Sequence, residues 1–165
     1  LQHGATHVVA VDVGYGQILP RLREDSRVDV RERTNARTMA PLDVPVQLCT
    51  IDVSFISLTL VLPSVIASLA PGGEVFALVK PQFEAGRVDA KGGVVKDPEV
   101  HRRVLREVAA KADALGIGLR GVIPSPILGP EGNREFMAHF SAGPASDGIE
   151  ARIDEAVAAA WEVVR

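Results

Sequence analysis

The sequence has 165 residues, 47% of them hydrophobic and 24% charged, which excludes a disordered chain and predicts one folded domain. Its net charge of −3 argues against a protein that binds nucleic acid over its whole surface, because phosphate contacts require clustered cations. The single cysteine, Cys49, excludes an internal disulfide, and no run approaches the ~20 apolar residues that span a bilayer. We therefore expect a cytoplasmic protein without a membrane partner.

Short apolar runs alternate with helical patterns along the chain. The apolar runs predict strands at 7–13, 27–33, 46–55, 73–80 and 119–126, and a late antiparallel strand at 135–142. Helical spacing of apolar residues predicts helices at 56–73, 98–115 and 147–164. This alternation is typical of an open α/β sheet with right-handed crossovers.

The clearest helix covers 98–115. Asp97 is its expected N-cap, Pro98 suits the first helical position, and Gly116 is expected to end it. The last helix has an apolar side that includes Ile153, and we expect that side to pack on the sheet.

Charge is distributed unevenly. Residues 80–106 contain seven Lys or Arg and four acids, whereas residues 147–165 contain two Arg and five acids. A basic central segment beside an acidic C-terminal helix allows an anionic substrate at one edge, although a mixed solvated surface has the same pattern.

Three of the predicted strands end in charged residues. Asp12, Asp52 and Lys80 follow apolar runs, and ligands of open α/β sheets bind beyond the carboxyl ends of the strands. Asp12 either holds a nucleoside ribose or only caps its strand. Asp52 stands among apolar residues, so we expect it to be buried and paired with Lys80. The pair is either a structural salt bridge or a functional one, in which the carboxylate orients the amine and burial favours loss of its proton.

The stretch "SPILGPEGNREF" at 125–136 supplies another candidate. Two prolines and two glycines predict a rigid loop that presents Glu135 at the start of the late strand, where it can reach the end of the sheet or pair with an arginine at the surface. No metal site is predicted, because the four histidines are scattered. The sequence also lacks the G-x-S-x-G, G-x-G-x-x-G and Walker patterns.

Five stretches together carry a resemblance: "VVAVDVGYGQ", "IDVSFISL", "LVKPQFEAGR", "AKGGVVKDPEVH" and "SPILGPEGNREF". They closely resemble the haemolysin-A-like (TlyA-type) family of ribosomal RNA 2′-O-methyltransferases, within the FtsJ-like ribose methyltransferases. The resemblance covers residues 1–142 as a methyltransferase domain, with 143–165 as a C-terminal amphipathic helix packing on the same domain. It implies a Rossmann-like fold with helices on both faces of the sheet, S-adenosylmethionine as cofactor, and ribosomal RNA or ribosomal subunits, not DNA, as partner.

The resemblance also implies roles for single residues. Asp52, Lys80 and Glu135 match the family's catalytic residues, and Lys80 would activate the ribose 2′-oxygen. The implied cofactor-binding residues are Asp12, Val13, Gly14, Asn35 and Asp52. The Gly-rich loop at 86–96 is expected to be a lid that contacts RNA.

Some parts of the family pattern are not found in these 165 residues. Because the chain starts without methionine, and "LQHGAT" reads as the end of a helix, we expect further sequence upstream. The glycine-rich first motif, a first catalytic lysine and a small RNA-binding domain are expected there. The sheet is then expected to lack its first strand, to have unpaired edges beside that position, and to bind the donor poorly. A non-catalytic RNA-binding or ribosome-assembly module is the alternative, and a nicotinamide-dependent oxidoreductase is a third hypothesis that leaves Lys80 without a role.

Overall fold

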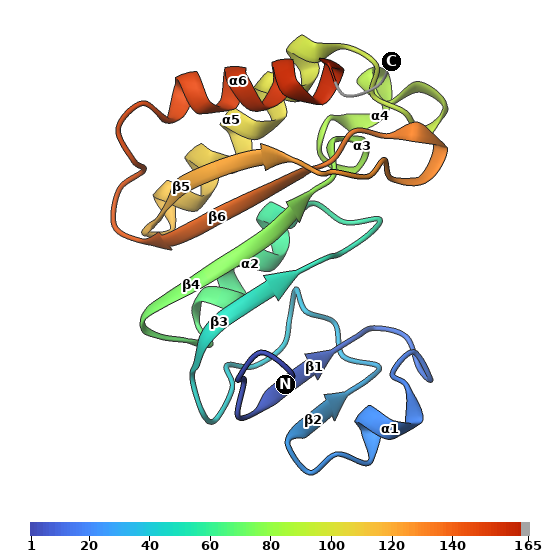
Figure 1. Ribbon diagram of the computed structural model, residues 1–165, viewed down its shortest axis with the longest axis vertical. Helices are drawn as coiled ribbons and strands as arrows, with labels where there is room; N and C mark the ends of the chain where they lie inside the picture. The colour runs from blue at the N-terminus through green and yellow to red at the C-terminus, as the bar shows by residue number, and fades with distance from the viewer. Residues whose placement is uncertain (163–165) are drawn as a thin grey trace.

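The computed structural model describes residues 1–162 and arranges them as two β-sheets with flanking helices (Figure 1). The strands are β1 Val8–Val11, β2 Val28–Arg31, β3 Val46–Ile51, β4 Leu69–Val79, β5 Ile117–Pro124 and β6 Phe136–Ala142. The α-helices are α1 Pro20–Arg23, α2 Leu58–Ile66, α3 Pro81–Glu84, α4 Gly86–Asp89, α5 Pro98–Ala114 and α6 Ile149–Glu162. Two 3₁₀ turns cover Lys91–Gly93 and Pro130–Gly132. No helix in these 162 residues is long and apolar enough to cross a membrane.

The sheet is interrupted between β1 and β3. Strands β1 and β2 form a parallel pair, while the other four have the order β3-β4-β6-β5. Strands β3 and β4 are parallel, and β6 is antiparallel to both of its neighbours. Within residues 1–162, β1 and β3 therefore each have one edge without a partner strand. This confirms the α/β class and the expected gap in the sheet.

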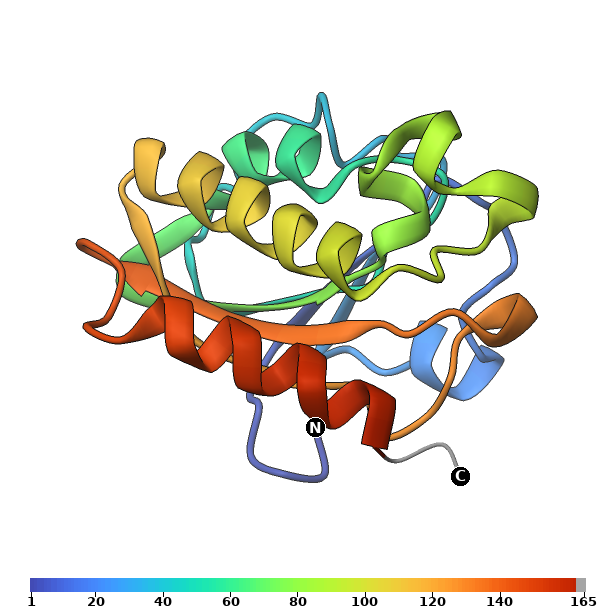
Figure 2. The same ribbon diagram turned by 90° about the horizontal axis from the view of Figure 1, so that it is seen from above.

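The core lies between the four-stranded sheet and its helices. Helices α2 and α5 lie on one side of this sheet and α6 lies on the other, as seen from above in Figure 2. Alternate residues of β4, namely Val75, Ala77 and Val79, are buried, as the period of two in a strand requires. Helix α5 buries Leu105 and Val108, and full burial of such side chains stabilises a fold by about 1.5–3 kcal/mol each.

Helix α5 confirms its sequence prediction. Asp97 is the N-cap and its Oδ1 accepts a hydrogen bond from the Glu99 backbone N–H at 2.9 Å. Pro98 is the first helical residue, and Gly116 follows the helix with a φ of 85°, a left-handed conformation that glycine adopts without strain. The described part of the last helix, α6, packs on α5 and β5, while its expected residues 163 and 164 lie outside the described residues.

The prediction of one helix from 56 to 73 was wrong in its second half. Helix α2 ends at Ile66, and β4 starts at Leu69, which pairs with Val46 of β3. The backbone of Pro71 cannot donate a helical hydrogen bond and Gly72 has a φ of 77°, so this stretch opens a strand instead of closing a helix.

Candidate active site

Asp52 and Lys80 meet at the carboxyl ends of β3 and β4. Because Ile51 pairs with Ala77 in a parallel register, both strands end at the same edge of the sheet. Lys80 Nζ lies 2.6 Å from Asp52 Oδ1 and donates a hydrogen bond to Ser54 Oγ at 3.0 Å. The predicted contact between Asp52 and Lys80 is therefore present.

The expected burial of Asp52 was wrong. Its side chain is 70% exposed, whereas that of Lys80 is only 12% exposed. The physical reason is the alternation of side chains along a strand: Ile51 points into the core, so the next residue points away from it. In this pair the Lys80 amine is shielded from solvent, whereas solvent or a ligand can still reach the Asp52 carboxylate.

Phe55 has an unusual backbone in the segment between Asp52 and α2. Its φ is 62°, which for a large non-glycine residue is a strained, left-handed conformation, and its side chain is 91% exposed. The ring lies 5.1 Å from that of Phe83, centroid to centroid. Strained residues cluster at binding sites, where the surrounding structure holds them in place. Sequence analysis did not identify Phe55 as part of the site, and no local sequence signal marks its backbone conformation.

Glu135 lies beside Lys80 on the neighbouring strand. Val79 pairs with Phe136 in the antiparallel register of β4 and β6, so Glu135 and Lys80 are the next residues beyond that pair. The Glu135 side chain is buried, and its Oε1 accepts a hydrogen bond from Gln82 Nε2 at 2.8 Å. Within the described chain, the carboxylate makes no ion pair with Lys80. The structure thus pairs Asp52 with Lys80 directly and places Glu135 at the adjacent strand end, while the catalytic role of the three residues stays a prediction.

The loop before Glu135 fits closely around it. A Cβ built on Gly129 would lie 2.4 Å from Glu135 Oε1, so only glycine leaves room for the carboxylate. Asn133 is buried; its Nδ2 donates to the Gly93 carbonyl at 2.8 Å and its Oδ1 accepts from Val95 N at 3.2 Å. These bonds fasten the Gly-rich segment to the loop. The predicted role of that segment as an RNA-contacting lid stays a prediction.

The predicted cofactor residues lie on the loops that follow β1 and β2. Asp12 Oδ1 accepts a hydrogen bond from Gly14 N at 2.6 Å, which closes a tight turn. Thr34 N donates to the Asp12 carbonyl at 3.0 Å, and this brings the segment with Asn35 next to the turn. Val13 is 74% exposed at the tip of the turn. Figure 1 shows the arrowheads of β1, β3 and β4 directed toward the same side of the molecule, so both sets of loops lie at one edge.

Glu32 also organises the turn after β1, although sequence analysis did not single it out. Its Oε1 accepts hydrogen bonds from Gly16 N at 2.7 Å and Gln17 N at 3.2 Å, and pairs with Arg23 at 2.8 Å. The hydrogen bond from the Arg23 guanidinium is the main reason that the pKa of Glu32 lies below its ordinary value. Residues 1–162 contain no group of three or more His, Cys, Asp or Glu side chains that could hold a metal ion.

Comparisons of this sequence with protein-family models and with curated proteins agree with each other. The family model for FtsJ-like methyltransferases matches residues 1–142. The 16S/23S rRNA (cytidine-2′-O)-methyltransferase TlyA of Mycobacterium tuberculosis is 48% identical over 139 residues, which are 82% of this chain and 52% of that protein. The chain thus spans about half the length of the curated relatives it matches.

Solved structures agree with the family match. The structure named "Putative hemolysin from Streptococcus thermophilus" is 44% identical with a TM-score of 0.94, covering 98% of this chain and 60% of that one. A SAM-dependent methyltransferase from Methanosarcina mazei shares 10% identity with a TM-score of 0.53, covering 84% of this chain and 92% of that one, and supports the Rossmann-like fold alone. From these matches together with its fold, the chain belongs to the FtsJ-like methyltransferase family.

Proposed function

We propose that the protein containing this chain transfers the methyl group of S-adenosylmethionine to a ribose 2′-hydroxyl of ribosomal RNA. The observation that carries the proposal is the Lys80–Asp52 contact of 2.6 Å at the carboxyl ends of neighbouring parallel strands. Family membership and the name of the Mycobacterium tuberculosis relative, which specifies cytidine 2′-O-methylation of 16S and 23S rRNA, support this reaction and this substrate. Ribosomal RNA or a ribosomal subunit in the cytoplasm is then the partner.

Lys80 and Asp52 have complementary tasks in the proposed reaction. In its neutral form the Lys80 amine would accept the proton of the 2′-hydroxyl as the ribose oxygen bonds the methyl carbon; the carbon–sulfur bond would break, and its electron pair would stay on the sulfur of the donor, which becomes neutral. The ammonium so formed is stabilised by Asp52 at 2.6 Å and by Ser54 Oγ at 3.0 Å. Glu135, the residue beside Lys80 at the adjacent strand end, would act from its hydrogen bond with Gln82. Positioning of the hydroxyl by these groups supplies a large part of the acceleration.

The turn after β1 has the chemistry to hold the donor nucleoside. S-adenosylmethionine supplies an electrophilic methyl group on a positively charged sulfur. In the described chain only Oδ1 of Asp12 receives a hydrogen bond, from Gly14 N, so Oδ2 is left to accept one from a ribose hydroxyl. The exposed Val13 side chain and Gly14 would line the same pocket as the ribose, and Asn35 would approach the adenine. These residues fit a nucleoside, and their role as donor ligands is part of the proposal.

The test is methyl transfer by the full-length gene product that contains these residues. Ribosomal subunits are incubated with radiolabelled S-adenosylmethionine, and labelled RNA is hydrolysed with alkali, which cannot cleave after a 2′-O-methylated ribose. Label in alkali-resistant dinucleotides supports the proposal. Subunit binding without any methyl incorporation would contradict it and support a non-catalytic RNA-binding module instead.

A further inference from the structure

Two segments leave the sheet side by side and carry the proposed reacting groups. The segment 52–57 runs from β3 to α2, and the segment 80–84 continues from β4 through α3. Within the described chain, no backbone hydrogen bond joins 53–57 to 80–84. Side chains alone therefore set the spacing of these segments beyond the strand ends.

Three residues of segment 80–84 contact the other segment through their side chains, in the same order along both. Lys80 Nζ contacts Asp52 Oδ1 at 2.6 Å and donates a hydrogen bond to Ser54 Oγ at 3.0 Å. The Phe83 ring contacts that of Phe55, with centroids 5.1 Å apart. Glu84 makes the third contact, at the start of α2.

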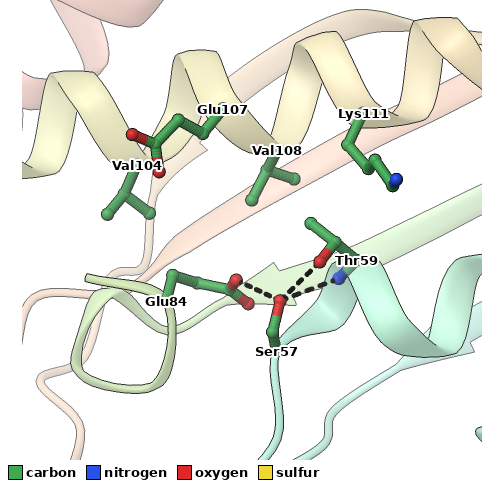
Figure 3. A pocket seen from close by; sticks show the side chains of 7 residues that line it. All are labelled: Ser57, Thr59, Glu84, Val104, Glu107, Val108 and Lys111. Atoms are coloured by element: carbon green, nitrogen blue, oxygen red, sulfur yellow. Dashed lines mark hydrogen bonds between the residues drawn. The ribbon is translucent and has the colours of Figure 1, made fainter. Parts of the chain in front are cut away.

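Both carboxylate oxygens of Glu84 accept hydrogen bonds from the start of α2. Its Oε2 accepts a hydrogen bond from Ser57 Oγ at 2.6 Å (Figure 3). Its Oε1 accepts one from Leu58 N at 2.7 Å. Ser57 is the N-cap of α2, and its Oγ also accepts from Thr59 N at 3.2 Å. A carboxylate here satisfies backbone N–H groups that the helix leaves free and interacts favourably with the positive end of the helix dipole.

The Glu84 carboxylate borders a cavity of about 320 Å³ between α2, α3 and α5. Glu107 and Lys111 of α5 line the opposite side, as Figure 3 shows. Burial raises the pKa of Glu84 above its ordinary value, and the charge of Glu107 adds to this increase, while the hydrogen bonds from Ser57 and Leu58 oppose it. The contact is thus half-buried, where a broken hydrogen bond costs more than at an exposed site.

We infer that Glu84 is a positioning residue for the proposed reaction: it holds segment 80–84 against segment 52–57 and so keeps the Lys80 amine in contact with the Asp52 carboxylate. The inference rests on the proposed function, because the activity of the pair gives this spacing its importance. Glu84 lies four residues after Lys80 in the short helix α3, so a shift at one end is passed on to the other. Displacement of reacting groups by about 1 Å can reduce a rate by about 100-fold.

The test compares Glu84→Ala, Glu84→Gln and Glu107→Ala in the full-length protein. Glu84→Ala is expected to lower kcat per folded molecule by about 10- to 100-fold, with the KM for S-adenosylmethionine unchanged within about twofold. Glu84→Gln keeps the length of the side chain and an acceptor for Leu58 N, so it is expected to restore most of the rate. Glu107→Ala, on the far side of the same cavity, is expected to behave like the parent protein.

A purely structural role for Glu84 gives a different result. Glu84→Ala would then lower the melting temperature while the folded molecules kept the kcat of the parent, and this outcome would overturn the inference. A crystal structure of Glu84→Ala supplies a readout that does not depend on activity: the separation of Lys80 Nζ from Asp52 Oδ1 is expected to exceed about 4 Å, the reach of an ion pair. An unchanged separation would overturn the inference even if the parent proves inactive, an outcome that would by itself reject only the proposed function.

Discussion

Lys80 Nζ lies 2.6 Å from Asp52 Oδ1, and it is the lysine of this pair that the protein shields while the carboxylate stays open to solvent. This arrangement suits a group that must exchange a proton with an incoming hydroxyl, because the contact with Asp52 holds the Lys80 amine in one position. A surface salt bridge of purely structural purpose would contribute only about 0–1 kcal/mol to stability.

Substitution of Asp52 tests whether the pair with Lys80 acts in the reaction or is only structural. In the full-length protein, Asp52→Asn is expected to lower the methyl-transfer rate at saturating donor by about 10-fold or more, since the protonated Lys80 loses its counter-charge. Single-turnover methylation of ribosomal subunits measures this rate. Asp29→Asn, which breaks a half-buried pair with Arg31 on β2, is the control and should leave the rate unchanged. Equal rates for Asp52→Asn and the parent would show that the pair is only structural.

The exposed Phe55 ring is expected to contact the RNA substrate. Stacking of a base on an aromatic side chain contributes about 1–3 kcal/mol, so Phe55→Ala should raise the KM for ribosomal subunits by about 5- to 150-fold. Its effect on the melting temperature should be small, because the ring is 91% exposed. Phe55→Tyr, which retains a ring, should restore the KM. Leu60→Ala, an exposed apolar residue on α2, is the control. A parent-like KM for Phe55→Ala would argue against stacking.

Gly129→Ala tests Glu135 without removing it. The added methyl group would lie 2.4 Å from the Glu135 carboxylate, the end of a side chain, so the carboxylate must move although the fold can tolerate the change. We expect a lower kcat and a melting temperature close to that of the parent. Gly121→Ala places a methyl group in open space and should change neither quantity. If Gly129→Ala keeps the full kcat, the position of Glu135 does not matter for the reaction.

We expect His101 to make the fold sensitive to acid. It is fully buried, neither ring nitrogen has a hydrogen-bond partner in the described chain, and burial, together with the charge of Arg134, lowers its pKa to about 4. The unfolded chain, with a pKa near 6.5, binds the proton more readily, so stability is fully present above about pH 6.5 and is lost as the pH falls toward 4. The loss approaches about 3 kcal/mol, at 1.36 kcal/mol for each pKa unit.

The measurement for His101 is urea unfolding of the parent and of His101→Phe between pH 7.5 and 4.5. The phenylalanine variant removes the titrating group, so its free energy of unfolding should fall less over this range, whatever its stability at pH 7.5. Parallel curves for the two proteins would show that His101 does not cause the acid sensitivity.

The contact between Asp52 and Lys80 could be predicted from the sequence because it depends only on the order and direction of the strands. Apolar runs marked β3 and β4, and parallel neighbours place the residues after them, Asp52 and Lys80, at one edge. The same kind of local pattern predicted α5, since Asp97 and Pro98 are strong signals for a helix start.

Features that depend on three-dimensional packing could not be predicted in this way. The apolar neighbours of Asp52 suggested burial, but alternation turns its side chain outward. The hydrogen bonds from Ser57 and Leu58 to Glu84 join segments that are far apart in sequence, and no residue pattern around Phe55 marks its left-handed backbone. Gly129 gave only a turn signal, and its close approach to Glu135 appears only when the loop is folded against β6.

The central claim is tested most directly by replacing Lys80 with methionine, which keeps the aliphatic stem and removes the amine. In the full-length protein, Lys80→Met should abolish methyl transfer to ribosomal subunits, while calorimetry should show donor affinity within a few-fold of the parent; Lys111→Ala, an exposed lysine on α5, should retain full activity. Methyl transfer by Lys80→Met at the rate of the parent would contradict the account.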